Sequence, residues 1–188
     1  MNNKALIAID FINDIVDAKG RIPSCAEQVK THHVIDKANL AISWARNQHI
    51  PIIFVKVGFQ DNYFAQPKHS PIFGKADQFG ALNLSGWGTE FHCDLDVQPH
   101  DSVVIKPRVN PFYNTSLDAM LRANKIEQLY FCGVSTSWAI QSAVRDAHDR
   151  DYQVHLITDA CASHSYEDHQ ASLAMLERLV TPHLAEEL

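Results

Sequence analysis

Five short apolar runs alternate with longer amphipathic segments along the chain. The runs are rich in valine, isoleucine and leucine, show no regular alternation with polar residues, and span 5–9, 50–57, 102–105, 128–132 and 154–157. Uninterrupted apolar runs of this length are typical of parallel strands that are covered on both faces. The pattern therefore predicts a buried, mainly parallel sheet.

The segments between these runs have the spacing of amphipathic helices. Apolar residues recur at intervals of three and four residues in 26–47, 116–123, 136–150 and 166–179. Strands that alternate with helices in this way predict an α/β fold of the doubly wound, Rossmann-like type. We expect a three-layer sandwich: a mainly parallel sheet of five or six strands, in the order 3-2-1-4-5-6, with helices on both faces.

Length and composition predict one globular domain, residues 1–188. The chain has 46% apolar and 20% charged residues, which is sufficient for one hydrophobic core. A net charge of −6 argues against nucleic acid and anionic membranes, because both require a concentrated basic surface. We find no apolar run that could span a bilayer and no signal peptide. We therefore expect a cytoplasmic protein whose partner is a small molecule.

The cysteines predict neither a disulfide framework nor a zinc knuckle. Cys25, Cys93, Cys132 and Cys161 are far apart in the chain and show no metal-binding spacing. We interpret them as reduced thiols. Cys132 lies inside a predicted strand, where a small buried core residue is the simplest interpretation.

Polar groups stand at the ends of three predicted strands. Asp10 follows the first strand, Lys106 follows the third, and the turn 133–139 follows the fourth. In doubly wound sheets, ligands bind beyond the carboxyl ends of the strands, where the strand order reverses. We expect the three to meet in one cleft, where burial would raise the pKa of Asp10 and a nearby ammonium would lower it. Taken alone, Asp10 could be a turn residue and Lys106 a solvated side chain.

Several motifs, in order along the chain, resemble those of the isochorismatase-like hydrolases. They are IAIDFIND at 7–14, VIKPR at 104–108, FYNT at 112–115, GVST at 133–136, AVRDA at 143–147 and TDACA at 158–162. The resemblance covers nearly the whole chain, and the segment 58–101 is its least alignable part. It implies the same doubly wound fold and a hydrolase activity.

The resemblance implies an Asp-Lys-Cys triad in which one member is missing. Asp10 matches the aspartate that accepts the thiol proton, Lys106 matches the lysine that supports the charged site, and Ala139 falls at the cysteine position. A methyl group cannot attack a carbonyl, so the covalent mechanism is not available. The family also tends to place a cis peptide at this turn, here between Val134 and Ser135, which would aim backbone N–H groups into the pocket.

We expect the substrate pocket to combine residues of this turn with aromatic side chains. Val134, Ser135 and Trp138 belong to the turn, and Phe112 belongs to the 112–115 motif. Trp87 lies in the segment 58–101, which is too long for an ordinary connection and is rich in aromatic residues. Such segments are usually functional lids or partner surfaces. The alternative is that Trp87 only fixes its loop to the domain.

We expect no metal and no cofactor. Nicotinamidase-type relatives hold a metal through an Asp-x-His motif after the second strand, whereas this chain reads QDNY at 60–63. His69, His92 and Cys93 lie in the same region, but their spacing matches no zinc site. A further departure is Ile12, which stands where many relatives carry glutamine and which suggests a different substrate.

Three functions follow from the missing thiol. The favoured one is a hydrolase of a small carboxylate-bearing substrate, in which Asp10 is the general acid and base and water is the nucleophile, as the resemblance to the isochorismatases proper implies. The second is a catalytically silent member that binds a ligand. The third is a cysteine amidohydrolase whose nucleophile has been replaced by Ala139. Family habit and the aromatic segment also predict a homo-oligomer, either a dimer or a tetramer.

Overall fold

A single parallel sheet of six strands forms the centre of the protein. The computed structural model describes residues 3–188, and Met1 and Asn2, which belong to the expected domain, lie outside the described residues. The strand order is β3-β2-β1-β4-β5-β6, and all five pairings are parallel. The strands are β1 (Lys4–Ile9), β2 (Ile52–Val57), β3 (Ser102–Lys106), β4 (Gln128–Val134), β5 (Gln153–Ala162) and β6 (Thr181–His183). The predicted strand order is therefore confirmed.

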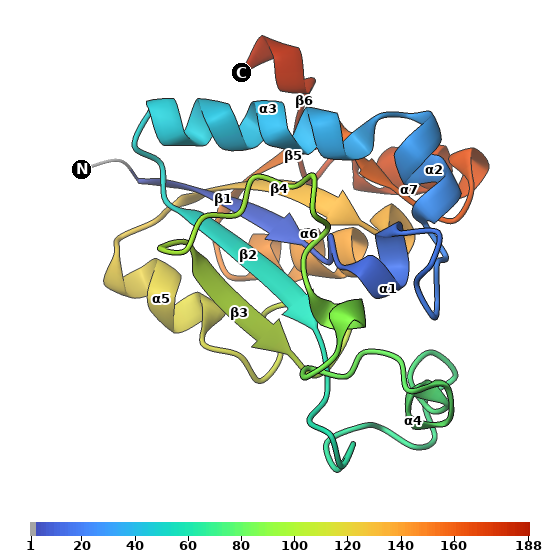
Figure 1. Ribbon diagram of the computed structural model, residues 1–188. Coiled ribbons are helices and arrows are strands. Elements are labelled where there is room, and N and C mark those ends of the chain that lie inside the picture. The colour runs from blue at the N-terminus through green and yellow to red at the C-terminus, as the bar shows by residue number, and fades with distance from the viewer. Residues whose placement is uncertain (1–2) are drawn as a thin grey trace.

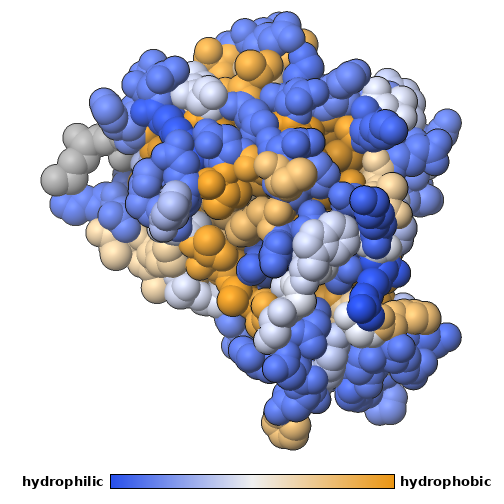
Figure 2. All heavy atoms as spheres, viewed as in Figure 1, coloured by the Kyte–Doolittle hydropathy of each residue, from blue (hydrophilic) through white to orange (hydrophobic). Residues whose placement is uncertain are grey.

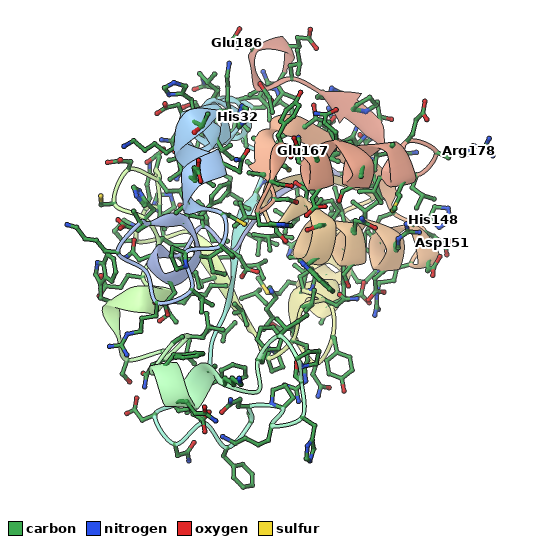
Figure 3. All side chains as sticks on the ribbon, turned by 90° about the vertical axis from the view of Figure 1, so that its right-hand side faces the viewer. His32, His148, Asp151, Glu167, Arg178 and Glu186 are labelled. Carbon is green, nitrogen blue, oxygen red and sulfur yellow. The ribbon has the colours of Figure 1, made fainter. Side chains whose placement is uncertain are left out.

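Helices cover both faces of this sheet, as the sequence predicts. Helix α3 contacts β1, β2 and β5, whereas α6 and α7 contact each other and β5. Figure 3 shows the α2–α3 side and the α6–α7 side of the sandwich with the sheet between them. The helices are α1 (Asn13–Val16), α2 (Ala26–Thr31), α3 (Val34–Asn47), α4 (Ala76–Phe79), α5 (Leu117–Ala123), α6 (Gln141–Asp149) and α7 (Tyr166–Leu176). Short helical turns are η1 (Trp87–Thr89), η2 (Thr136–Ile140) and η3 (Ala185–Glu187).

Two predicted helices are interrupted. The expected helix 26–47 is two helices, because His33 between α2 and α3 has a left-handed backbone with φ of 54°. The expected helix 136–150 begins with the π-helical turn η2 and continues as α6. Hydrophobic spacing alone does not detect such breaks, because the apolar face continues through them.

The main core lies between the sheet and its helices. Five of the six residues of β1 are buried, and β4 is buried from its second residue onward. The buried face of α3 includes several small side chains, among them Ala38, Ala41 and Ala45. These alanines allow the helix to approach the strands closely, so that the two central strands are covered on both sides.

The long segment between β2 and β3 forms a second, smaller core. In Figure 1 it extends below the sheet and carries α4. The second core combines Ile12, which follows β1, and Val57, which ends β2, with buried residues of the segment, namely Phe59, Tyr63, Phe73, Ala76, Ala81 and Leu82. The Tyr63 hydroxyl donates to the Ala81 carbonyl at 2.9 Å, and Asp14 accepts a hydrogen bond from the Leu82 backbone at 2.6 Å. The segment is therefore a packed subregion that is fixed to the sheet.

The surface is mixed in polarity. Figure 2 shows hydrophilic residues over most of the visible face, with smaller hydrophobic patches between them. Large exposed apolar side chains include Phe64, Met175 and Trp138. Among the described residues, we find no helix with the length and apolar character needed to cross a lipid bilayer.

Candidate active site

The strand order brings the three predicted strand ends together. Strand β1 pairs with β2 on one side and with β4 on the other, so the strand order reverses at β1. Asp10 directly follows β1, and Lys106 is the last residue of β3. The turn that carries Ala139 follows β4. These residues therefore lie at the carboxyl edge of the sheet, at its topological switch point.

Asp10 and Lys106 form a buried ion pair. The distance from Lys106 Nζ to Asp10 Oδ2 is 2.7 Å, and the two side chains are 1% and 5% exposed. Asp10 Oδ1 accepts a hydrogen bond from the Val57 backbone at 2.8 Å, and Lys106 Nζ also donates to the Arg108 carbonyl at 3.2 Å. Burial raises the pKa of Asp10 above its ordinary value, although Lys106 and the Val57 N–H oppose this shift. The carboxyl group is therefore easier to protonate than that of an exposed aspartate.

The turn after β4 has a specialised backbone. The Val134–Ser135 peptide bond is cis, as the family resemblance implied. Ser135 O accepts hydrogen bonds from the backbone N–H groups of Trp138 and Ile140. Gly133 has φ of 132°, and a Cβ at this position would lie 2.1 Å from the Ile9 carbonyl oxygen. Glycine is required here because only a residue without Cβ allows β4 to approach the end of β1 so closely.

A cavity of about 120 Å³ contains the ion pair and the turn. Ala139 lies at its wall and is 3% exposed. The lining is mostly apolar and consists of Asp10, Ile15, Ile22, Ser24, Cys25, Val57, Ile72, Phe73, Leu82, Lys106, Val109, Val134, Ser135, Trp138 and Ala139. Such a site has the usual composition of a small-molecule pocket, with few polar groups in an apolar surround.

Four of the predicted pocket residues lie in this cavity together with Asp10 and Lys106. They are Val134, Ser135, Trp138 and Ala139. Their grouping follows from the strand order, since the β4 turn lies beside the end of β1. Trp138 is 58% exposed, so its ring forms part of the outer wall.

Trp87 and Phe112 are not in the cavity lining, and this expectation needs correction. The Trp87 carbonyl accepts a hydrogen bond from Asn13 Nδ2 at 3.0 Å, while its side chain is 46% exposed. Phe112 is buried in the main core, where its ring stacks on Tyr152 and the Arg150 guanidinium lies over it. Trp87 therefore fixes its loop through its backbone, and Phe112 is a packing residue.

The sequence did not predict several residues that line the cavity. Ile72, Phe73 and Leu82 come from the long segment after β2, and Val109 follows β3. Cys25 comes from the connection before α2. These side chains belong to no motif, and hydrophobic spacing does not distinguish an apolar pocket wall from a core. Burial first, and then the charge of Asp10, raise the pKa of the Cys25 thiol to about 11, although a hydrogen bond from Ser24 opposes them.

The residues that could hold a metal lie outside this cavity. Among the described residues, His92, Cys93 and Asp94 form a group whose potential ligand atoms lie within 4.8 Å of one another. His92 and Asp94 line a different cavity, beside α2 and α3. Ile12 is also absent from the active-site lining, because it packs in the second core and pairs with Phe91.

Fold and site together define a class of α/β proteins with an acid and an ammonium at the switch point of the sheet. The model of the isochorismatase domain matches residues 4–187. A ureidoacrylate amidohydrolase, RutB of Acinetobacter baylyi, is 32% identical, with 90% of this chain and 75% of the relative covered. The chain therefore belongs to the isochorismatase family, and the expected class, an isochorismatase-like hydrolase, is confirmed at the level of the family.

Solved structures agree with the fold. An isochorismatase family protein from Burkholderia thailandensis has a TM-score of 0.85 at 26% identity, with 100% of this chain and 95% of that chain covered. A family protein from Desulfovibrio vulgaris has a TM-score of 0.87 at 18% identity, covering 99% of this chain and 96% of that one. The second likeness concerns the fold alone.

Proposed function

We propose that the protein hydrolyses a small carboxylate-bearing substrate, with Asp10 as general acid and base, water as nucleophile and no covalent thioester. One observation carries this proposal: a buried Asp10–Lys106 pair shares a cavity with Ala139. The acid and the ammonium are in place, and the side chain at the position of the nucleophile is inert. Proton transfer is the chemistry that remains to this site.

The charges of the pair fit a carboxylate substrate. Burial favours the protonated form of Asp10, and in that form Lys106 keeps an uncompensated positive charge inside an apolar cavity. A substrate carboxylate beside Lys106 would restore neutrality and would raise the pKa of Asp10 further. Binding of substrate would therefore prepare Asp10 as an acid.

A vinyl ether is the first substrate class for this site. Asp10 gives its proton to the vinyl carbon, and the adjacent carbon becomes an oxocarbenium ion. Water adds to that carbon and returns a proton to Asp10. The resulting hemiketal breaks into an alcohol and a carbonyl product. Lys106 holds the substrate carboxylate and lowers the energy of Asp10 when it is ionised.

An amide or ureido bond is the second substrate class. The name of the RutB relative, ureidoacrylate amidohydrolase, supports this class. Here Asp10 would take a proton from water as the water attacks the carbonyl carbon, and would then give the proton to the leaving nitrogen. Backbone N–H groups of the turn at Ser135–Ala139 are the candidate donors to the developing oxyanion, except those of Ser137 and Trp138, which already donate to Ser163 Oγ and to Ser135 O.

A panel of vinyl ethers, ureido acids and amides tests the proposal with the unmodified protein and with Asp10→Asn. We expect turnover of at least one substrate and a loss of about 10²-fold or more in Asp10→Asn. The matched control is Asp149→Asn, because the Asp149 side chain is 81% exposed on the distant end of α6. Calorimetric binding without product would overturn the proposal and would indicate a ligand-binding member.

The proposal places Ala139 at the position of the nucleophile. The variant Ala139→Cys tests whether this alanine has replaced a thiol. If Ala139 replaces an original thiol, Ala139→Cys should gain amide hydrolysis that depends on Asp10. An Ala139→Cys variant that gains no amide hydrolysis and keeps its Asp10-dependent turnover would support the thiol-independent mechanism.

We also propose that the protein works in the cytoplasm as a homo-oligomer, a dimer or a tetramer. The four cysteines, which lie within the described residues, are free, as expected for a reducing compartment. Exposed apolar side chains such as Met175 and Leu184 offer surface for self-association. Light scattering of the purified protein measures the stoichiometry. A monomer at all concentrations would contradict the proposed homo-oligomer.

A further inference from the structure

A second cavity lies between α2, the end of β5 and α7. Its volume is about 260 Å³, larger than the active-site cavity of about 120 Å³. In Figure 3, His32 at the end of α2 and Glu167 in the first turn of α7 mark two of the flanking elements. The floor includes the buried residues Ser163 and His169, whereas His32 and Tyr166 at the rim are exposed. The two cavities share no lining residue.

Gln28 supplies an unused hydrogen-bond acceptor at this cavity. Its side-chain Oε1 is buried and has no partner, and it is the one buried side-chain N or O atom among residues 3–188 in this state. Buried polar atoms in folded proteins are nearly always paired, because an unpaired one loses its hydration without compensation. Gln28 lines the cavity, and a turn of its side chain toward the cavity would let a ligand N–H group supply the missing donor.

The walls favour a flat, uncharged ligand. The rings of His32 and Tyr166 are stacked, with centroids 5.3 Å apart and an interplanar angle of 25°. Asp159 is the acidic residue of the lining. Its Oδ1 accepts a hydrogen bond from Ala185 N, and Lys37 Nζ lies 3.9 Å from its Oδ2 but pairs more closely with Glu186 Oε1, at 2.5 Å. His169 is buried, and burial followed by the nearby His32 lowers its pKa, which favours the neutral form of the ring. Asp159 already has a hydrogen-bond donor and a nearby ammonium, so the contact that identifies a ligand here is the missing donor to Gln28, which a neutral N–H group supplies.

Three hydrogen bonds join the cavity floor to the turn of the active site, one of them donated by Ser163 Oγ to Ser137 Oγ at 3.2 Å. His169 Nδ1 lies 2.8 Å from Thr136 Oγ1, and Ser163 Oγ accepts from the Ser137 backbone at 3.0 Å. Thr136 and Ser137 belong to the same turn as Ala139, which lines the active-site cavity. Any ligand that moves Ser163 or His169 would therefore act directly on this turn.

We propose that this cavity is a second small-molecule site, which takes a neutral planar heterocycle that donates one N–H to Gln28 Oε1, and that its occupation is coupled to the turn carrying Ala139. This inference does not rest on the proposed hydrolysis, because binding is its primary measurement. The coupling follows from the shared hydrogen bonds. It gives the protein a means of changing the active-site backbone from a separate site.

Titration of the ¹⁵N-labelled protein with benzimidazole, followed by NMR, tests the proposal. Benzimidazole is flat, uncharged at pH 7.5 and carries one N–H, and 1-methylbenzimidazole is the matched probe without that donor. We expect saturable shifts at Gln28 and His169 and about tenfold weaker binding of the methylated probe. Gln28→Leu should weaken benzimidazole binding to the same extent and leave the methylated probe unaffected. Gln78→Leu, the same change at an exposed position outside the lining, should alter neither.

Each other outcome counts against the proposal. Absence of saturable shifts up to about 10 mM probe, equal binding of both probes, or shifts centred on Asp10 and Val57 would overturn the second site. Saturation at Gln28 with unmoved amide signals of Ser137 and Ala139 would overturn the coupling. Failure of the hydrolytic proposal would not change these readings, since they require no turnover.

Discussion

Lys106 Nζ and Asp10 Oδ2 are 2.7 Å apart in a position from which water is almost excluded. The two residues come from strands that are separated by β2 in the sheet, so the pair bridges two elements at the carboxyl edge. Each charge is tolerated because the other is present, since the desolvation of two buried charges is offset only by their attraction and their hydrogen bonds. Stability and the proposed catalysis therefore depend on the same contact.

We predict that Lys106→Met lowers the free energy of unfolding by about 3–5 kcal/mol at pH 8, because it leaves the Asp10 carboxylate buried without a partner. The pKa of Asp10 is already raised in the folded state, and loss of the ammonium raises it further. The folded variant then binds a proton more tightly than the unfolded chain, so its stability is lost as pH rises through the folded pKa. Urea unfolding at pH 5 and pH 8 should show the smaller defect at pH 5.

The double variant Asp10→Asn/Lys106→Met is the control for this interpretation. It removes both charges, and we expect it to recover most of the stability lost in Lys106→Met, by about 2–3 kcal/mol. Stability losses that simply add would mean that the two residues do not interact energetically, and would contradict the role assigned to the pair.

Cys25 provides a second prediction, because among residues 3–188 it is the one thiol in the lining of the active-site cavity. Its pKa of about 11 leaves it protonated at pH 7, and it is 1% exposed. We expect Cys25→Ser to keep Asp10-dependent turnover within about twofold, since a buried protonated thiol is a poor nucleophile. Iodoacetamide should modify the exposed Cys93 much faster than Cys25. Loss of turnover in Cys25→Ser, with the fold intact, would identify Cys25 as the nucleophile.

Gly88→Ala should destabilise the long segment between β2 and β3. A Cβ on Gly88 would lie 2.3 Å from the carboxyl atoms of Asp14. Asp14 accepts hydrogen bonds from the backbone of Arg21 and of Leu82, so it cannot move without breaking them. We expect a loss of about 1–3 kcal/mol in thermal or urea unfolding.

Gly86→Ala is the matched control for that change. Both glycines lie in the same loop, but the nearest atom to a Cβ on Gly86 is the Asn83 carbonyl oxygen at 3.5 Å, an ordinary contact. We expect Gly86→Ala to alter stability by less than about 0.5 kcal/mol. Equal effects of the two substitutions would refute the contact between Gly88 and Asp14 as the cause.

Much of the fold could be predicted because the pattern of apolar residues indicates which strands are buried. A strand such as β1, covered on both faces, must be apolar throughout, and this allowed the order of strands and helices to be inferred. The helix break at His33 could not be predicted, because it depends on one backbone dihedral and leaves the apolar spacing almost unchanged. The short β6 (Thr181–His183) contains Pro182 and has no apolar run, so the hydrophobic pattern did not predict this strand either.

The polar half of the site could be predicted, whereas its apolar wall could not. Asp10 and Lys106 stand at strand ends, and parallel topology brings such ends to one edge. The walls formed by Ile72, Phe73 and Leu82 depend on how the segment after β2 folds over the sheet, and no periodicity encodes that path. Trp87 was the wrong choice from this segment for the same reason.

A pair of histidines on the β5–β6 edge predicts how stability depends on pH. His155 Nδ1 lies 2.9 Å from His183 Nε2, and the His155 ring stacks on Tyr130 at 4.3 Å. Burial lowers the pKa of both rings, and for His155 the neighbouring His183 and Lys4 lower it further. The unfolded rings titrate near pH 6.5, so the unfolded chain binds more protons below that pH, and stability is lost as the pH falls.

We expect His155→Phe, which keeps a ring on Tyr130, to reduce the fall in unfolding free energy between pH 7.5 and pH 5.5, by on the order of 0.5 kcal/mol after allowance for solvent screening. His148→Gln is the control, because this histidine is exposed and its ring hydrogen-bonds to the neighbouring Asp149. Urea unfolding at several pH values provides the measurement, and an unchanged pH slope in His155→Phe would refute the pair as its source.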